Sequence, residues 1–211
     1  MKRIVVTQRV DIIKEYGERR DAIDQRWIDL LLECNLFPIF IPNNIEFVKS
    51  FILTEKFDGL LLTGGNDLVK YGGNSPERDE VERTLLEHFI KYKLPILGIC
   101  RGMQLIQDYF GIKLKPISGH VATRHKLMVN PFSQYSEELK ALGSVNTFHH
   151  FATKSTVKEL IVGARTSKNI IMQIEHKNLP IYGQMWHSER EFPFVDAELN
   201  LFRKIFCSNK L

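Results

Sequence analysis

The chain has 211 residues, of which 44% are hydrophobic and 26% are charged, and these ordinary globular values exclude a disordered or collagen-like chain. The net charge of +4 is spread along the sequence, so nucleic-acid binding is not expected, whereas an enzyme that handles acidic small molecules suits it. The length predicts one domain over residues 1–211.

Cysteine usage and apolar runs indicate the compartment. Cys34, Cys100 and Cys207 lie far apart, with no CxxC pair and no metal-binding spacing, which is typical of a reducing compartment. The apolar run at residues 4–6 is too short for a secretory signal, and no run approaches the roughly 20 residues of a membrane span. We therefore expect a cytoplasmic protein that does not insert into membranes.

The first half of the chain alternates short apolar runs with segments of helical periodicity. Strands are predicted at residues 4–6, 38–42, 59–63 and 95–99, and helices at 24–33, 46–56, 79–92 and 103–110. Because these strands, including the one between prolines at 38–42, are apolar at consecutive positions, they are typical of a buried parallel sheet covered by helices on both faces.

The second half has shorter strands with more alternation, predicted at residues 126–129, 161–164, 170–175 and 181–184, followed by a helix at 197–206. We interpret some of these strands as antiparallel additions. The predicted fold class is therefore α/β: a mostly parallel central sheet flanked by helices, with added short antiparallel strands.

The pentapeptide Gly98-Ile99-Cys100-Arg101-Gly102 lies where a buried strand ends and a helix begins. A turn of this kind projects a nucleophile above the sheet, and the positive end of the helix stabilises a thiolate there. The Arg101 N–H would point to the same place and could stabilise an oxyanion. The alternative is that Cys100 is merely a small buried residue, but the glycines and the strand–helix junction favour a nucleophile.

His187 and Glu189 follow the last predicted strand and are two residues apart. On extended chain, such positions point the same way, so the carboxylate can orient the imidazole. Together with Cys100 they predict a nucleophile, a base and an orienting group.

These motifs resemble those of a known family. Residues 98–104, the upstream Thr63-Gly64-Gly65 and the downstream segment 184–189 resemble class I glutamine amidotransferases, whose flavodoxin-like fold is then expected. Within them, Arg101-Gly102-Met103-Gln104 and the preceding segment 76–79 resemble the free-standing γ-glutamyl hydrolases of the peptidase C26 group. The resemblance extends from about residue 4 to about residue 206.

The resemblance implies a role for individual residues and requires no cofactor and no metal. Ser188 differs from the family pattern, since many relatives have proline at this position. This difference affects the rigidity of the loop more than its chemistry. The implied roles are nucleophile for Cys100, base and acid for His187, orienting group for Glu189, oxyanion donors for Gly65 (or Gly64) and Arg101, and substrate binding for Gln104, Thr147, Phe148 and His149.

Two other clusters have competing interpretations. His120 and His125 could ligate a metal, but no local carboxylate or cysteine joins them, so packing is the favoured interpretation. Arg78, Asp79 and Glu82 open a predicted helix, where acidic residues stabilise the N-terminal end; contact with Arg101 is the alternative.

The expected partner is a small-molecule γ-glutamyl substrate, and two classes are open. One is a γ-glutamyl amine or peptide of polyamine breakdown, and the other is nucleotide-linked γ-glutamyl-CDP-amidate, which supplies phosphoramidate groups to bacterial capsules. The segments 7–10 and 63–67 resemble the second more closely. Cations in predicted loops would suit a diphosphate: Arg9, Arg19, Arg20, Lys70, Arg124 and Arg190.

Two other classes of function compete with a free-standing hydrolase. One is an ammonia-supplying subunit that depends on a synthetase partner, which is not favoured. The other is a binding module without catalysis, and the intact set of Cys100, His187 and Glu189 argues against it.

Overall fold

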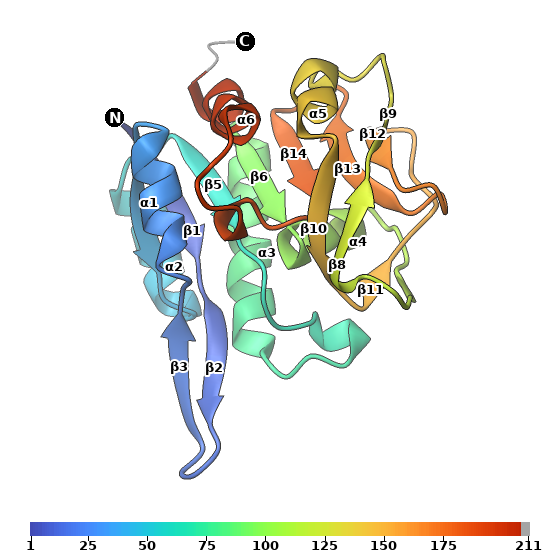
Figure 1. Cartoon of the computed structure of the whole chain (residues 1–211). Helices are drawn as coiled ribbons and strands as arrows, with labels where there is room; N and C mark the ends of the chain where they lie inside the picture. Colours follow the sequence, from blue (N-terminus) through green and yellow to red (C-terminus); the bar gives the residue numbers. More distant parts are fainter. Residues whose placement is uncertain (208–211) are drawn as a thin grey trace.

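The computed structural model describes residues 1–207, and its centre is an eight-stranded sheet with the order β4-β1-β5-β6-β14-β13-β12-β9 (Figure 1). The first five strands are parallel: β4 (Leu36–Ile41), β1 (Lys2–Thr7), β5 (Gly59–Leu62), β6 (Ile96–Ile99) and β14 (Ile181–Gln184). Three antiparallel strands extend the sheet: β13 (Ile171–His176), β12 (Leu160–Arg165) and β9 (Met128–Val129). The predicted mostly parallel sheet with antiparallel additions is confirmed.

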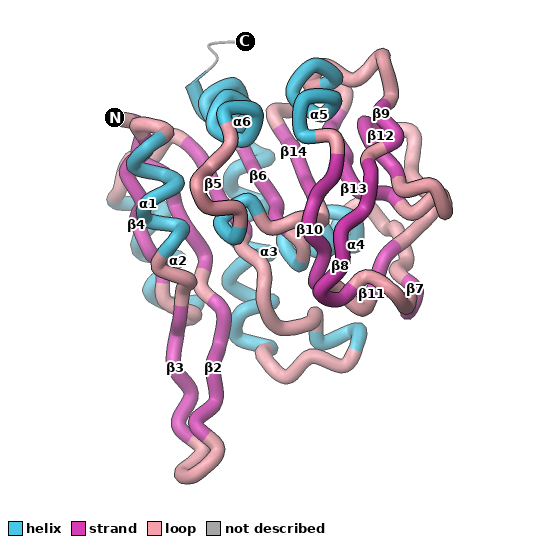
Figure 2. The backbone as a smooth tube through the Cα atoms, viewed as in Figure 1, coloured by secondary structure: helices cyan, strands magenta, loops and turns pink. Residues whose placement is uncertain are grey.

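Helices cover both faces of the sheet (Figure 2). Trp27 and Phe202 lie 6.3 Å apart between ring centroids, so the helices that carry them share a face. This first layer contains α1 (Arg26–Glu33), α6 (Asp196–Cys207) and α5 (Ser136–Leu142), and the second contains α2 (Ile45–Thr54), α3 (Pro76–Lys91) and α4 (Arg101–Tyr109). Within residues 1–207, no helix combines the length and the apolar character needed to cross a membrane.

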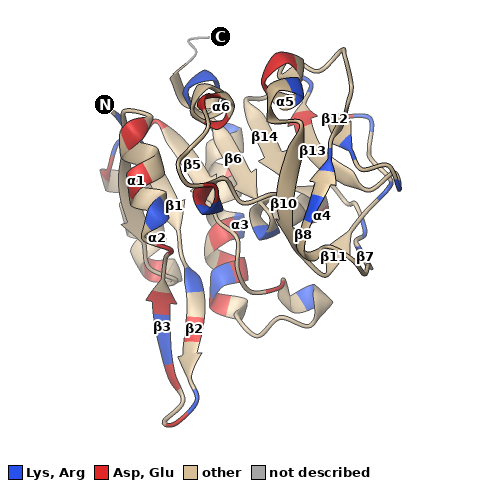
Figure 3. Cartoon of the chain, in the orientation of Figure 1, with Lys and Arg blue, Asp and Glu red and all other residues tan. Residues whose placement is uncertain are grey.

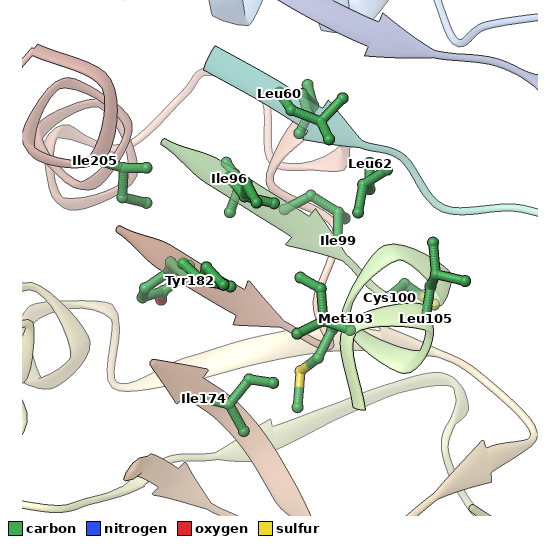
Figure 4. Packing of buried hydrophobic residues seen from close by; sticks show 14 of the residues in the cluster. Leu60, Leu62, Ile96, Ile99, Cys100, Met103, Leu105, Ile174, Tyr182 and Ile205 are labelled. Carbon is green, nitrogen blue, oxygen red and sulfur yellow. The ribbon is translucent and has the colours of Figure 1, made fainter. Parts of the chain in front are cut away.

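The central strands β5, β6 and β14 are buried at every position because both of their faces are covered. Figure 4 shows Leu60, Ile96, Tyr182 and Ile174 from neighbouring strands packed side by side, and all four are fully buried. Burial of such side chains is the main contribution to the stability of the fold. It also fixes the positions of the loops that follow β5, β6 and β14.

The strand predicted at residues 38–42 exists as β4, but the expectation that it is buried is wrong. Within residues 1–207 it is the outermost strand and pairs only with β1. Phe37 is consequently 51% exposed, and Ile39 and Phe40 are only partly buried. An edge strand has helices on its faces but no neighbour on its outer side.

A charged hairpin, not expected from the sequence, projects from the body of the molecule (Figure 1). It consists of β2 (Arg9–Ile13) and β3 (Glu18–Ala22), and Figure 3 shows basic and acidic residues along both strands. Strands of this composition need not bury an apolar face, so hydrophobic periodicity does not reveal them.

Two further small sheets lie beside the central one: β8 (Val121–Lys126) with β10 (Ser144–Phe148), and β7 (Lys115–Pro116) with β11 (Phe151–Ala152). The single strand predicted at residues 126–129 is therefore wrong. Leu127 separates β8 from β9, and these two strands belong to different sheets.

Candidate active site

The predicted functional segments meet at the carboxyl ends of three adjacent parallel strands. The Thr63–Asp67 segment follows β5, Cys100 follows β6, and His187 follows β14 shortly after Gln184. Ligands of open α/β sheets bind outside this edge. The order β5-β6-β14 therefore places residues from three distant parts of the chain next to one another.

Cys100 occupies a strained corner between β6 and α4, as Figure 4 shows. Its backbone has φ 51° and ψ −101°, which a residue with a Cβ rarely adopts. Its N–H donates to the Gln184 carbonyl at 2.7 Å, which ties the corner to β14. A Cβ at Gly102 would lie 2.2 Å from the Leu62 carbonyl oxygen, so the glycine allows α4 to start directly against β5.

His187 and Glu189 form a buried pair, each about 3% exposed, with 2.7 Å between Nδ1 and Oε1. The carboxylate can only accept, so Nδ1 carries a proton, and Nε2 has no partner within residues 1–207. Burial by itself lowers the pKa of His187, but its interactions with Cys100 and with Glu189 outweigh burial and raise the pKa to about 10. The pair therefore favours an imidazolium.

A glycine lies between the thiol and the imidazole. A Cβ on Gly64 would lie 2.6 Å from His187 Cε1 and 3.5 Å from Cys100 Cβ. Only a residue without a side chain leaves room for these two groups to face the same space.

The backbone of His187 is held by Asn146 of β10. Asn146 Nδ2 donates to the His187 carbonyl at 2.9 Å and to Glu191 Oε1 at 2.8 Å, and the His187 N–H donates to Asn146 Oδ1 at 3.0 Å. The resemblance implied substrate binding for Thr147 and Phe148, which follow Asn146, and gave Asn146 itself no separate role. The structure shows that this side chain instead positions the histidine.

Ser188 is fixed by hydrogen bonds where many relatives of the family have proline. Its Oγ donates to Glu198 Oε2 at 2.7 Å and accepts from Gln184 Nε2 at 2.7 Å. Trp186 Nε1 donates to the other oxygen of Glu198 at 2.7 Å. These buried bonds restrain the loop that carries His187 and Glu189.

Arg78 holds the loop after β5 through hydrogen bonds to its backbone carbonyls. Its buried guanidinium donates to the carbonyls of Thr63 at 2.8 Å and Gly64 at 3.1 Å, and also to that of Gly65. Burial lowers the pKa of Arg78 to about 10, so it still carries a charge at neutral pH, balanced by Glu82 at 2.8 Å. Because their carbonyls accept hydrogen bonds from Arg78, the peptide groups of the loop are held in one orientation.

The contact between Arg101 and the start of α3 is present. The Arg101 guanidinium pairs with Asp79 and Glu82, and Asp79 also accepts from the Val69 N–H at 2.9 Å. Asp79 thus lies in the first turn of α3, as the favoured interpretation expects, and also makes the side-chain contact with Arg101 that was the alternative. The Arg101 side chain is directed away from the cavity, while its N–H lies in the first turn of α4.

A cavity of about 440 Å³ opens in front of Cys100 and His187. It brings together most of the predicted site residues and adds Gly72, Gly73 and Asn74, which the sequence did not indicate. Gln104 is anchored there because its Nε2 donates to the Phe151 carbonyl at 2.9 Å. The lining consists of Gly65, Asn66, Asp67, Gly72, Gly73, Asn74, Cys100, Gln104, Phe148, His149, His150, His187 and Arg190.

Thr147 is not brought to the cavity. Its side chain is fully buried and its Oγ lies 2.9 Å from Thr123 Oγ of the paired strand β8. Successive residues of a strand face opposite sides, so Thr147 points away from the side that Asn146 and Phe148 occupy.

Three histidines near the cavity contact one another: the rings of His120 and His125 are stacked, and those of His120 and His149 are tilted. The rings of His120 and His125 are 4.1 Å apart, and those of His120 and His149 are 4.8 Å apart. Burial lowers the pKa of His120 to about 4 and that of His149 to about 3, so both are neutral at pH 7. Within residues 1–207, no group of three or more His, Cys, Asp or Glu residues is arranged to hold a metal ion.

The loop cations singled out in the sequence differ in their pairing. Five of them pair with nearby carboxylates at 3.1 Å or less, whereas the Nε of Arg190 lies 3.7 Å from Glu189 Oε1. Arg190 also lines the cavity, with its guanidinium carbon 4.3 Å from the centroid of the Phe148 ring. The five pairs are Arg9–Asp11, Arg19–Glu77, Arg20–Glu18, Lys70–Asp108 and Arg124–Glu191.

Comparison with known proteins identifies similar chains. The model of the Peptidase C26 family matches residues 5–189. The gamma-glutamyl-CDP-amidate hydrolase of Campylobacter jejuni subsp. jejuni serotype O:2 is 33% identical over 191 residues, which cover 89% of this chain and 90% of that protein.

Two solved structures share the fold. A glutamine amidotransferase from Thermotoga maritima superposes with a TM-score of 0.67 at 13% identity, covering 96% of this chain and 83% of that one. A protein from Thermoplasma acidophilum, described as a candidate component of GMP synthase, gives a TM-score of 0.72 at 20% identity, covering 98% and 93%. The expected class I glutamine amidotransferase fold is confirmed.

Proposed function

Because the chain belongs to the Peptidase C26 family, we propose that it hydrolyses a γ-glutamyl amide bond through Cys100, His187 and Glu189 and releases glutamate. The observation that carries this proposal is the placement of Cys100 and His187 on one cavity, with Glu189 bound to the far nitrogen of the imidazole. A thiol, a base and an orienting carboxylate in this order are the requirements of covalent acyl transfer.

In the first half of the reaction, the Cys100 thiolate attacks the γ-carbonyl carbon. The oxyanion that forms accepts hydrogen bonds from the N–H groups of Gly65 and Arg101. Gly65 lines the cavity and Gly64 does not, which supports Gly65 as the donor. Each donor of this kind contributes about 10²–10³ in rate.

His187 then gives the proton on Nε2 to the leaving nitrogen, the C–N bond breaks, and a thioester remains on Cys100. In the second half, His187 takes a proton from water as the water attacks the thioester. Glutamate leaves, and the thiolate and imidazolium are restored. Glu189 keeps the proton of Nδ1 in place throughout, so Nε2 is the nitrogen that exchanges protons.

The substrate that we favour is γ-glutamyl-CDP-amidate, which would give glutamate and cytidine diphosphoramidate. The name of the Campylobacter relative supports it, and that relative matches across 89% of this chain. Arg190 in the cavity wall also suits an anionic leaving group.

A panel of γ-glutamyl compounds tests this assignment. We expect the highest kcat/KM on γ-glutamyl-CDP-amidate, lower values on γ-glutamyl amines, and the lowest on glutamine, because differences in kcat/KM measure differences in transition-state binding. A higher kcat/KM on γ-glutamyl amines would assign the protein to amine breakdown. Glutamine hydrolysis that rises only when a synthetase is added would assign it the role of supplying ammonia to that synthetase.

A further inference from the structure

Arg190 differs from the other basic residues around the cavity because its guanidinium is not neutralised by a hydrogen-bonded acid. Its Nε is buried and has no partner within residues 1–207. The nearest carboxylate oxygen, Glu189 Oε1, is 3.7 Å from Nε, beyond hydrogen-bonding distance, and this oxygen already accepts from His187. By contrast, Arg19 pairs with Glu77 and donates at 2.9 Å to the carbonyl of Asn74, which lines the cavity.

Phe148 holds the Arg190 side chain in place. The guanidinium carbon lies 4.3 Å from the centroid of the Phe148 ring, and the same ring meets His187 edge-on at 5.9 Å. A guanidinium that stacks on an aromatic face keeps its N–H groups at its edge, free to donate. Arg190, Phe148 and His187 therefore form one continuous wall of the cavity.

This wall is the side on which the leaving group must lie. In the proposed reaction, His187 protonates the leaving nitrogen, so the atoms attached to that nitrogen are next to the imidazole. Gln104 contributes to another part of the lining, where it is anchored on Phe151. The group that departs is thus placed beside Arg190, three residues after His187.

We propose that Arg190 is the residue that selects an anionic phosphoryl leaving group, by donating hydrogen bonds to its oxygens while Phe148 holds the guanidinium flat. This inference rests on the proposed γ-glutamyl hydrolysis, and it assigns specificity to one side chain. Two parallel N–H groups match two phosphoryl oxygens, which a lysine ammonium cannot reproduce.

The first test compares an anionic with an uncharged leaving group. For Arg190→Gln, the ratio of kcat/KM on γ-glutamyl-CDP-amidate to kcat/KM on γ-glutamyl-p-nitroanilide should fall by about 10- to 100-fold, as expected for the loss of charged hydrogen bonds. Arg190→Lys should recover only part of the ratio. The matched control is Arg203→Gln, which removes an arginine that donates to the Glu33 carbonyl away from the cavity and should leave the ratio unchanged. An unchanged ratio in Arg190→Gln would overturn the inference.

The second test measures the contact without turnover. CDP is titrated calorimetrically into the Cys100→Ala protein and into the double variant Cys100→Ala/Arg190→Gln. We expect the dissociation constant for CDP to be about 10-fold higher in the double variant. Equal CDP binding by both proteins would refute the role of Arg190 even if the wild-type enzyme cleaves γ-glutamyl-CDP-amidate. Weakened CDP binding, together with a wild-type protein inactive on every γ-glutamyl compound, would refute the proposed reaction but support the anion site.

Discussion

Asn146 and His187 are joined by a reciprocal pair of hydrogen bonds, 2.9 Å from the side-chain amide to the His187 carbonyl and 3.0 Å from the His187 N–H to the side-chain oxygen. The two residues come from different sheets, since Asn146 is on β10 and His187 follows β14. One side chain therefore fixes where the histidine lies relative to Cys100.

We expect Asn146→Ala to lower kcat by about 10- to 100-fold with little change in KM, because a catalytic group displaced by a fraction of an ångström loses much of its effect. The matched control is Asn130→Ala. Asn130 also bonds backbone on both sides, to the Val162 carbonyl at 2.9 Å and from the Phe132 N–H at 3.0 Å, but it lies away from the cavity. Each variant should lose about 1–2 kcal/mol in the free energy of unfolding, measured in urea. Equal kcat in both would contradict the role of Asn146.

This pair also shows where prediction from the sequence stops. Cys100 between its glycines and the His187–Glu189 spacing are local patterns, and local patterns can be read directly. The role of Asn146 depends on a strand pairing that brings together residues 41 positions apart. The period of two along a strand could have separated Thr147 from its neighbours, but only if β10 had been predicted.

The fold likewise has elements that the sequence predicts and elements that it does not. Apolar runs predicted β1, β5, β6 and β14, because strands buried on both faces have a strong compositional signal. The hairpin of β2 and β3 is rich in charge, and hydrophobic periodicity did not predict it because most of its side chains face solvent. The role of Arg78 was not predicted for another reason. An arginine in a charged helix is expected to be exposed, and only the structure shows its hydrogen bonds to three consecutive carbonyls.

Cys100 and Cys34 should differ in reactivity. We expect iodoacetamide to modify Cys100, which lines the cavity, and to abolish activity, while Cys34 stays unmodified because burial raises the pKa of its thiol to about 12. Mass spectrometry of the labelled peptides measures the sites. Cys100→Ala should remove turnover and leave the protein folded, and Cys34→Ala should keep near-normal kcat. Retention of activity by Cys100→Ala would exclude it as the nucleophile.

The strained backbone at Cys100 gives a separate prediction for stability. At φ 51° a Cβ is unfavourable, so Cys100→Gly should be more stable than Cys100→Ala by about 1 kcal/mol, although both are inactive. Thermal and urea unfolding of the two variants measure this difference. A Gly variant less stable than the Ala variant would show that the corner carries no such strain.

Glu189 should control the alkaline limb of activity. The pKa of His187 is raised to about 10, so its imidazolium persists over neutral pH and is lost only as pH rises through about 10. Glu189→Gln removes a charge that raises this pKa, so the fall in kcat/KM should occur at lower pH. It should also reduce kcat by about 10- to 100-fold, less than His187→Ala. An alkaline limb at the same pH in Glu189→Gln would remove Glu189 from this role.

Glu198 should impose a pH dependence on stability. Burial raises the pKa of this carboxyl to about 7, against which the hydrogen bonds from Ser188 and Trp186 act. A raised folded-state pKa means that the folded protein binds the proton more tightly than the unfolded chain. The contribution of Glu198 to the free energy of unfolding is then fully present below the ordinary glutamate pKa of about 4.5, and it is lost as pH rises through about 7.

We therefore expect Glu198→Gln, which stays uncharged, to gain about 3 kcal/mol in unfolding free energy relative to the wild type between pH 4.5 and pH 8. Urea unfolding at several pH values measures this difference. Ser188→Ala deletes one donor to the carboxylate, so it should raise the pKa of Glu198 further and shift the transition to higher pH. The variant lacks only the ionisable carboxyl of Glu198. If the free energy of unfolding of the wild type and of Glu198→Gln changed in parallel with pH, Glu198 would not titrate in this range.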